Sequence, residues 1–277
     1  MFKDILVQID STEASARRLD VAASLAERSE AHLTGLHVNW LQENLYWADP
    51  YAAGAVLQAA EEWAADEAKR AEARFREGVA GRAIASEWRV VRGPQVRSLA
   101  AHGRLADLIV VGQHDPDGEA GSDTAGLAEQ VALSAGRPCL VVPYAGARPS
   151  LGERVLIAWN GSREAVRAVN DALPFLKSAQ KVHILAVENH AERLGRDVEL
   201  PTDIAAHLCR HGVKVETEND AAGDISIGEL LLSRAADLDI DLLVMGCYGH
   251  ARLRELILGG VTRTLLERTT VPLLMSH

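Results

Sequence analysis

Aromatic residues, cysteine pairs and long apolar runs are scarce in this sequence, and each shortage excludes a class of protein. Aromatic residues make up 4% of the 277 residues, so the core must consist of Ala, Leu, Val and Ile, as is usual for parallel sheets covered by helices. The cysteines Cys139, Cys209 and Cys247 form no CxxC pair, which indicates packing roles in a reducing compartment. No apolar run approaches the ~18 residues of a membrane span, and the opening segment Met1–Asp10 lacks a signal-peptide pattern. We therefore expect a cytoplasmic protein.

An excess of basic residues is also missing, since the formal net charge is -10. Nucleic acids and anionic membranes attract basic surfaces. We therefore expect neither as a partner, whereas a small anion held in a local site is compatible with this charge.

The chain contains two copies of one pattern. Asp107–Gly112 and Asp241–Gly246 each consist of an aspartate, four apolar residues and a glycine, and they start 134 residues apart. Arg137–Val142 and Val271–Ser276 match at the same spacing, with no gap between the two anchors. An internal repeat of this length predicts duplicated domains.

The openings of the two copies match as well. Ile5–Ser11 resembles Val155–Gly161 at a spacing of 150 residues, so the second copy is shorter in its middle. The joint between them is rich in Gly and Pro, as a linker requires. We predict two domains, residues 1–145 and 152–277. The extra length of the first falls near Trp40–Tyr51, an aromatic stretch that we interpret as a loop packed on a helix in preference to a ligand platform.

Strand and helix patterns alternate in each half. In the second half, short apolar or alternating runs predict strands at 155–159, 181–187, 213–218, 241–245 and 272–275. Helical patterns with start and stop signals cover 163–176, 202–211, 226–236 (or from 224) and 260–268. This alternation predicts an α/β fold with two tandem doubly wound domains, each a five-stranded parallel sheet with helices on both faces.

A glycine-rich loop follows the fourth strand of the second half. It contains Gly246, Gly249, Gly259 and Gly260 in the pattern G-x2-G-x9-G-G. Ligands of parallel sheets bind beyond the carboxyl ends of the strands, and the free N–H groups of a helix start suit phosphate oxygens. Thr262 could add a hydroxyl. By spacing alone, a loop that needs glycine merely for its turns explains the pattern equally well.

The paired halves, this loop and the closing segment 270–277 resemble the universal stress protein family in its tandem-domain form. The resemblance implies pairing of the domains through their last strands, and ATP binding in members that keep the glycine loop. ATP, with or without Mg²⁺, is therefore the expected cofactor. The nucleotide-binding positions that the resemblance implies are Trp159, Asn160, Val187, Gly246, Gly249, Gly259, Gly260, Val261 and Thr262.

Two of these positions depart from the family pattern. Gly260 stands where the family has Ser or Thr, which removes a hydroxyl, and Asn160 stands where it has Asp. An amide keeps hydrogen-bonding capacity but loses the charge. Both changes bear on the affinity for ATP.

The matching loop of the first half is degenerate. Gly112 and Gly126 are kept, but Asp115 and Ala125 replace the other two glycines. A carboxylate near phosphates is repulsive, so we expect no ATP in this half. Asp10 keeps the family's acid after the first strand, which predicts a pocket that survives without its phosphate end.

No other motif predicts catalysis or metal binding. His207 and His211 share a helix face but are too few for a structural zinc site, and the chain has neither a G-x-S-x-G elbow nor a P-loop. We expect a stress-response or signalling protein that binds an adenine nucleotide, with unknown protein partners and a homodimer as one option. The alternatives are an interaction protein that has lost nucleotide binding and a weak ATPase; whether the protein is an enzyme stays open, since no catalytic residue is identifiable.

Overall fold

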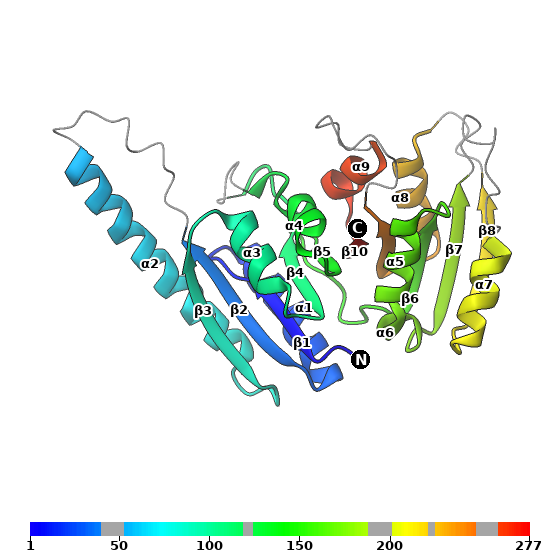
Figure 1. The fold of residues 1–277 in the computed structure, drawn as a ribbon, viewed down its shortest axis with the longest axis horizontal. Coiled ribbons are helices and arrows are strands. Elements are labelled where there is room, and N and C mark those ends of the chain that lie inside the picture. Colours follow the sequence, from blue (N-terminus) through cyan, green and yellow to red (C-terminus); the bar gives the residue numbers. More distant parts are fainter. Residues whose placement is uncertain (40–52, 119–123, 188–200, 221–224, 248–259) are drawn as a thin grey trace.

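The structure is a computed structural model, and it describes residues 1–39, 53–118, 124–187, 201–220, 225–247 and 260–277. Strands and helices alternate along the chain (Figure 1). The first half contains β1 (Asp4–Gln8), α1 (Glu13–Ser29), β2 (His32–Asn39), α2 (Ala53–Val79), β3 (Ser86–Arg92), α3 (Gln95–Gly103), β4 (Leu108–Gly112), α4 (Leu127–Ala135) and β5 (Cys139–Val142). The second half contains β6 (Arg154–Trp159), α5 (Arg163–Asp171), α6 (Leu173–Leu176), β7 (Lys181–Val187), α7 (Pro201–Arg210), β8 (Val215–Asp220), α8 (Ile227–Asp237), β9 (Leu242–Gly246), α9 (Gly260–Arg268) and β10 (Leu273–Ser276).

The strands form one 10-stranded sheet in the order β3-β2-β1-β4-β5-β10-β9-β6-β7-β8. Neighbours within each half run parallel, whereas β5 and β10 pair antiparallel at the centre with Leu140 opposite Leu274. These two leucines are matching residues of the repeat, so a pseudo-twofold axis passes between them. The structure confirms two tandem α/β domains with one strand order, joined through their last strands.

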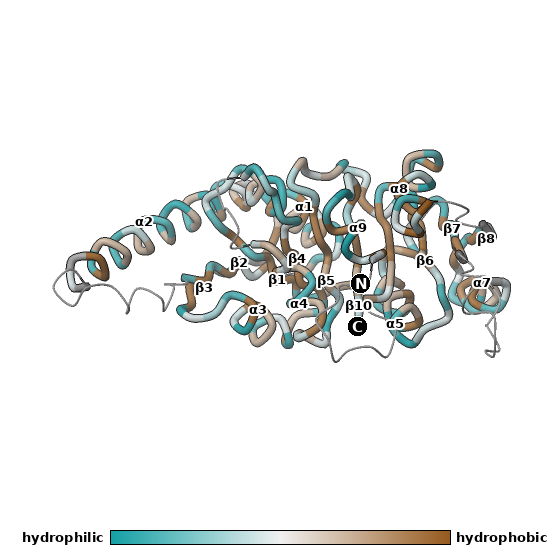
Figure 2. Tube along the Cα trace, turned by 90° about the horizontal axis from the view of Figure 1, so that it is seen from above, coloured by the Kyte–Doolittle hydropathy of each residue, from teal (hydrophilic) through white to brown (hydrophobic). Residues whose placement is uncertain are grey.

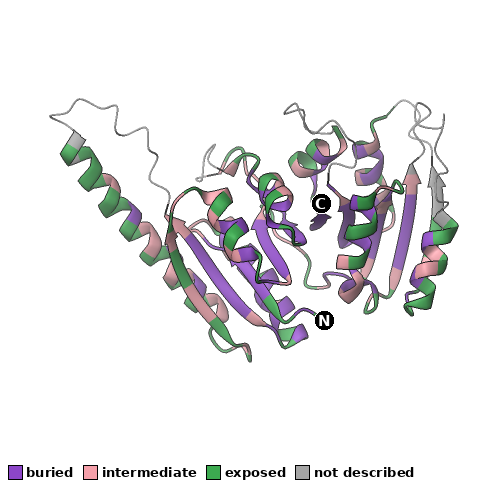
Figure 3. Cartoon of the chain, in the orientation of Figure 1, coloured by how far each residue is buried: buried purple, intermediate pink, exposed green. Residues whose placement is uncertain are grey.

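Helices cover both faces of the sheet, as the sequence predicts. The apolar side chains of α1, α2, α5, α6 and α7 pack on one face, and those of α3, α4, α8 and α9 pack on the other. The apolar central strands lie between these layers, and burial decreases toward the edge strand β3 (Figures 2 and 3). None of the described helices is long and apolar enough to cross a bilayer.

The aspartate that opens each repeat anchor has a structural role at the base of the sheet. Asp107 Oδ2 accepts hydrogen bonds from the backbone of Lys3 (2.7 Å) and Asp4 (3.1 Å). Asp241 accepts three such bonds from the backbone of residues 152–154, at 3.0–3.1 Å. Each carboxylate therefore holds the start of the first strand of its own domain beside the fourth.

The halves also pack directly against each other beside the central strands. The rings of Phe2 and Phe175 lie 5.3 Å apart, and one apolar cluster includes buried residues of both halves. Arg28 Nη2 donates to the carbonyl of Leu151 at 2.9 Å. The two domains therefore share a core as well as a sheet.

The predicted helix over residues 163–176 is wrong in one respect. It is broken at Ala172 into α5 and the short α6, which begins with Leu173 and Pro174. Proline has no N–H to continue a helix but suits the first turn of a new one. The other predicted elements of the second half occur, with ends displaced by at most two residues.

Candidate functional site

The strand ends of the second half bring several predicted nucleotide-binding residues to one edge of the sheet. Trp159, Val187 and Gly246 are the last residues of β6, β7 and β9. These strands are neighbours, because β6 pairs with β7 on one side and with β9 on the other. The carboxyl end of a parallel sheet is where ligands of such folds bind.

Gly246 has a packing reason that is independent of any ligand. A Cβ at this position would lie 2.5 Å from the backbone nitrogen of Ala165 and 2.6 Å from the carbonyl carbon of Glu164. Both atoms belong to the first turn of α5, which packs on the end of β9. The glycine is therefore required for the close approach of α5.

Trp159 is 3% exposed, and its indole Nε1–H has no hydrogen-bond partner among the described residues. A buried donor without a partner is unfavourable by about 1–3 kcal/mol, and such groups call for a specific explanation. The matching residue of the first half is Ile9, which lines a cleft there.

Asn160 accepts the same kind of backbone hydrogen bond as Asp10 does in the first half. Its Oδ1 accepts a hydrogen bond from Ser162 N at 3.1 Å, and Asp10 Oδ1 accepts one from Thr12 N at 2.9 Å. Ser162 and Thr12 are the N-caps of α5 and α1. The exchange of acid for amide therefore preserves the turn that leads into the helix.

The start of α9 is the other described part of the predicted site. Gly260, its first residue, is exposed, and a Cβ there would meet no heavy atom within 4 Å. Val261 is half-buried and Thr262 is buried. Figure 1 shows α9 at the end of the domain toward which the arrows of β7 and β8 point. Gly249, Gly259 and the side chain of Val187 lie outside the described residues.

The first half has a cleft of about 1060 Å³ at the matching strand ends. It lies between α1 and α2, beyond β1 and β2, and Thr124 lines it from the segment before α4. The expectation that a pocket survives in this half is therefore confirmed. The sequence does not predict that α2 forms one wall of this cleft, because the long helix shows only a charged, Ala-rich pattern.

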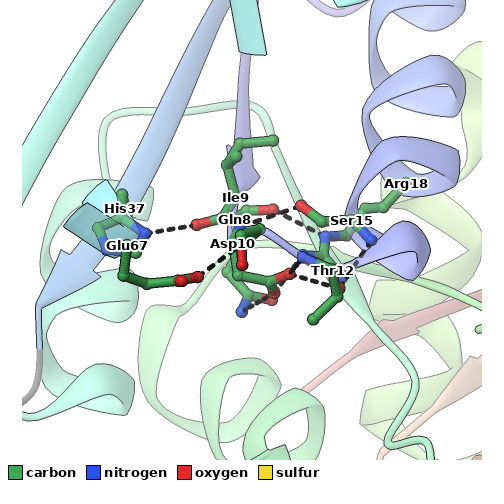
Figure 4. Close-up of polar contacts among 9 residues, drawn as sticks. Gln8, Ile9, Asp10, Thr12, Ser15, Arg18, His37 and Glu67 are labelled. Carbon is green, nitrogen blue, oxygen red and sulfur yellow. Dashed lines mark hydrogen bonds and ion pairs between the residues drawn. The ribbon is translucent and has the colours of Figure 1, made fainter. Parts of the chain in front are cut away.

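The carboxylate of Asp10 faces this cleft but is already paired (Figure 4). Arg18 Nη2 lies 2.9 Å from Asp10 Oδ2, and its Nε donates to the carbonyl of Gln8 at 2.7 Å. Burial raises the pKa of Asp10, but Arg18 and the hydrogen bonds from Thr12 outweigh that effect and hold the pKa below its usual value. A Cβ at Gly112 would collide with the buried guanidinium.

Sequence reasoning missed this ion pair, although a signal exists. Counted from the two helix caps, Thr12 and Ser162, the residue that matches Arg18 is Ala168. The acid and the base are thus both absent from the second half, where Asn160 replaces Asp10. Paired replacement of opposite charges indicates contact.

Two further acids at the cleft are paired. Glu67 Oε1 accepts a hydrogen bond from Ser11 N at 3.0 Å, and Glu67 Oε2 forms an ion pair with Arg70 Nη2 at 2.8 Å. Burial raises the pKa of Glu67, and these donors outweigh it, so that the pKa is lowered overall. Glu13 lies 3.5 Å from Arg74. Figure 4 shows Glu67 reaching from α2 toward the turn after β1.

Within the described ranges, histidine and cysteine side chains form no metal site. The rings of His207, on α7, and His211, which follows the last residue of α7, lie 4.7 Å apart, and no group of three potential metal ligands occurs in the described part of the chain. Cys139 and Cys247 are buried, and burial raises the pKa of both thiols, that of Cys247 to about 12. These cysteines are packing residues.

A duplicated, doubly wound α/β fold with candidate sites at the strand ends defines the class of this protein. Within that class, the chain matches the Universal stress protein family over residues 1–143 and 152–277, and it belongs to that family. A universal stress protein of Synechocystis sp. is 28% identical over 178 residues, which cover 61% of this chain and 57% of that protein.

Solved structures share the fold. A universal stress protein from Archaeoglobus fulgidus superposes with a TM-score of 0.68 at 19% identity, covering 99% of this chain and 96% of that chain. A protein described as a putative universal stress protein from Pseudomonas aeruginosa superposes with a TM-score of 0.59 at 17% identity, covering 99% and 93%. At these identities the likeness extends to the fold alone.

Proposed function

We propose that this universal stress protein binds ATP or a related adenine nucleotide in its second half, and that its role is stress response or signalling without catalysis. The observation that supports this best is the exposed start of α9 at Gly260, which follows the glycine loop from β9. Backbone N–H groups at a helix start, together with the helix dipole, favour phosphate oxygens.

The rest of the nucleotide would lie along the neighbouring strand ends. Trp159, with its buried and unpartnered N–H, and Asn160, with its exposed amide, border this edge. Adenine and ribose offer acceptors for the exposed amide of Asn160. ATP would bring Mg²⁺ with it, coordinated by the phosphates and water.

Calorimetric titration with ATP tests the proposal, and Gly260 offers a clean variant. Gly260→Asp meets no steric obstacle and places a carboxylate at a helix start, which stabilises a helix by about 0.3–1 kcal/mol. The same charge repels phosphate, so affinity should fall at least tenfold while thermal stability is kept or raised. Gly260→Asn is the uncharged control and should bind nearly as tightly as wild type.

The outcome also decides between the alternatives. At most one ATP per chain is expected, because Asp115 and Ala125 replace loop glycines in the first half. A wild-type chain that binds no adenine nucleotide would support the interaction protein without a nucleotide. Phosphate release that Gly260→Asp abolishes would support the weak ATPase.

A further inference from the structure

We propose that the first half has a second ligand site of different chemistry. The cleft between α1 and α2 takes an uncharged, ring-bearing polar molecule of nucleoside size, and it discriminates against phosphates. This inference is independent of nucleotide binding in the second half.

Size and position both suit a small ligand. Ligand sites of folded proteins have volumes of roughly 300–1,000 Å³, and this cleft of about 1060 Å³ lies just above that range. It opens at the carboxyl ends of β1 and β2, where parallel sheets bind ligands.

Three of the four acidic side chains that line the cleft are paired with arginines. Asp10 is paired with Arg18, Glu67 with Arg70, and Glu13 with Arg74. Among the described residues that line it, the cleft therefore offers no unpaired guanidinium to an anion and no unpaired interior carboxylate to a cation. The one further lining acid, Glu77, is exposed on α2. An uncharged ligand matches such a lining without breaking an ion pair.

The end of the cleft nearest α4 is unsuited to phosphate. Thr124 lines the cleft there, and its Oγ1 lies 2.8 Å from His114 Nδ1. His114 is followed by Asp115, whose Oδ1 accepts a hydrogen bond from Asp117 N at 3.2 Å. Through His114, the acidic loop that carries Asp115 and Asp117 contacts this end of the cleft, and its negative charge disfavours a phosphate there.

The walls can recognise a polar ring. Leu19, Val38 and Ala64 provide apolar contact area, and the Trp63 indole, 63% exposed, provides a face for stacking. Asn39 lies at the end of β2 and lines the same space; its Oδ1 lies 2.8 Å from His37 Nε2, and its Nδ2 can donate to a hydroxyl or ring nitrogen of a ligand. Flat rings with several hydrogen-bonding groups satisfy both kinds of wall.

The experiment compares probes that differ only in charge, with variants matched between the two halves. Full-length protein is titrated calorimetrically with adenosine, guanosine and cytidine, and then with AMP and ATP. Ala16 lines the cleft from α1, and its counterpart in α5 is Val166. Ala16→Phe fills the cleft, whereas Val166→Phe adds a similar bulk to the other half.

We expect at least one of the three nucleosides to bind wild type, with affinity reduced at least tenfold in Ala16→Phe and unchanged in Val166→Phe. ATP binding should not respond to Ala16→Phe. Ala73→Phe, which fills the same cleft from the exposed side of α2, replaces Ala16→Phe if circular dichroism shows that the latter is misfolded. Absence of nucleoside binding, nucleoside binding insensitive to both cleft variants, or AMP and ATP binding that these variants abolish would overturn the proposal. If the wild-type protein binds no ATP, only the function proposed for the second half is overturned.

Discussion

At the scale of single residues, the two copies differ most informatively at one buried ion pair. Asp10 and Arg18 in the first half correspond to Asn160 and Ala168 in the second. A buried guanidinium is tolerable only with a partner, so neither member of the pair could be lost alone without a penalty. The second half avoids the penalty because both charges are absent.

Arg18→Ala should therefore destabilise the protein by about 3 kcal/mol, because it leaves the Asp10 carboxylate half-buried without its partner. Asp10→Asn combined with Arg18→Ala reproduces the pair found in the second half and should recover more than half of that loss. Urea unfolding of wild type, Arg18→Ala and the double variant measures both effects. A double variant less stable than Arg18→Ala would show that the ion pair is not the reason.

The same carboxylate predicts a pH dependence. The pKa of Asp10 is lowered in the folded protein, despite burial that raises it, by Arg18 and Thr12. Its stabilising contribution is therefore present above the unfolded-state pKa of about 4 and is lost as pH falls toward the lower folded-state pKa. We expect the stability advantage of wild type over Asp10→Asn to shrink between pH 6 and pH 3. A difference in unfolding free energy between wild type and Asp10→Asn that stays constant across that range would contradict this.

The sequence predicted where residues stand relative to strand ends, but it did not predict the tertiary contacts that those residues make. Gly246 stands at the predicted strand end, yet its need for glycine comes from the approach of α5, a tertiary contact that no spacing reveals. Asp10 was recognised, whereas its partner Arg18 was not, because an arginine in an amphipathic helix looks like a surface residue. Burial of Trp159 with a free N–H likewise depends on packing around it.

At the scale of elements, α9 connects the candidate nucleotide site to the first half. The Gln113 side chain, 5% exposed, donates from Nε2 to the carbonyls of Leu266 (2.9 Å) and Thr269 (3.3 Å) at the end of α9. Its Oε1 accepts from Tyr144 N at 3.3 Å. The helix whose start is proposed to bind phosphate is thus held at its other end by the opposite domain.

Gln113→Leu should cost about 1–3 kcal/mol of stability, because two buried carbonyls lose their donor. Gln58→Leu, a change at an exposed glutamine of α2, should cost less than about 0.5 kcal/mol and serves as the control. Chemical denaturation measures both. Equal stabilities for the two variants would mean that water replaces the Gln113 amide without loss.

Helices and strands were predictable where cap residues and apolar periodicity were strong, whereas the way in which a helix packs on the sheet was not. Ser226, one of the two cap residues that the sequence offers for this helix, caps α8 in the structure, where Glu229 completes a capping box. The break before Pro174 was missed because the apolar period continues across it. The cleft under α2 depends on how that helix lies across β2, where the Phe75 ring fills the space above Gly35, and helix periodicity carries no such information.

At the scale of the whole molecule, sheet and core both continue across the boundary between the halves. Leu140 pairs with Leu274, the ring of Phe2 contacts that of Phe175, and one apolar cluster includes residues of both domains. Separating the halves would expose the edges of β5 and β10 as well as this apolar surface. Neither half is therefore expected to lose its structure while the other keeps it.

This continuity predicts a single cooperative unfolding transition and a particular response to ATP. A ligand that binds only the folded state stabilises it by about 2.7 kcal/mol at a concentration of 100 Kd. If unfolding is all-or-none, that stabilisation must appear in both halves, although ATP is proposed to bind only the second. Amide hydrogen exchange should therefore show equal slowing in β1 and β4 and in β6 and β9 when ATP is added, and calorimetry should show one transition moved to higher temperature. Slowing confined to β6 and β9, or two resolved transitions, would show instead that the halves unfold independently despite the shared sheet.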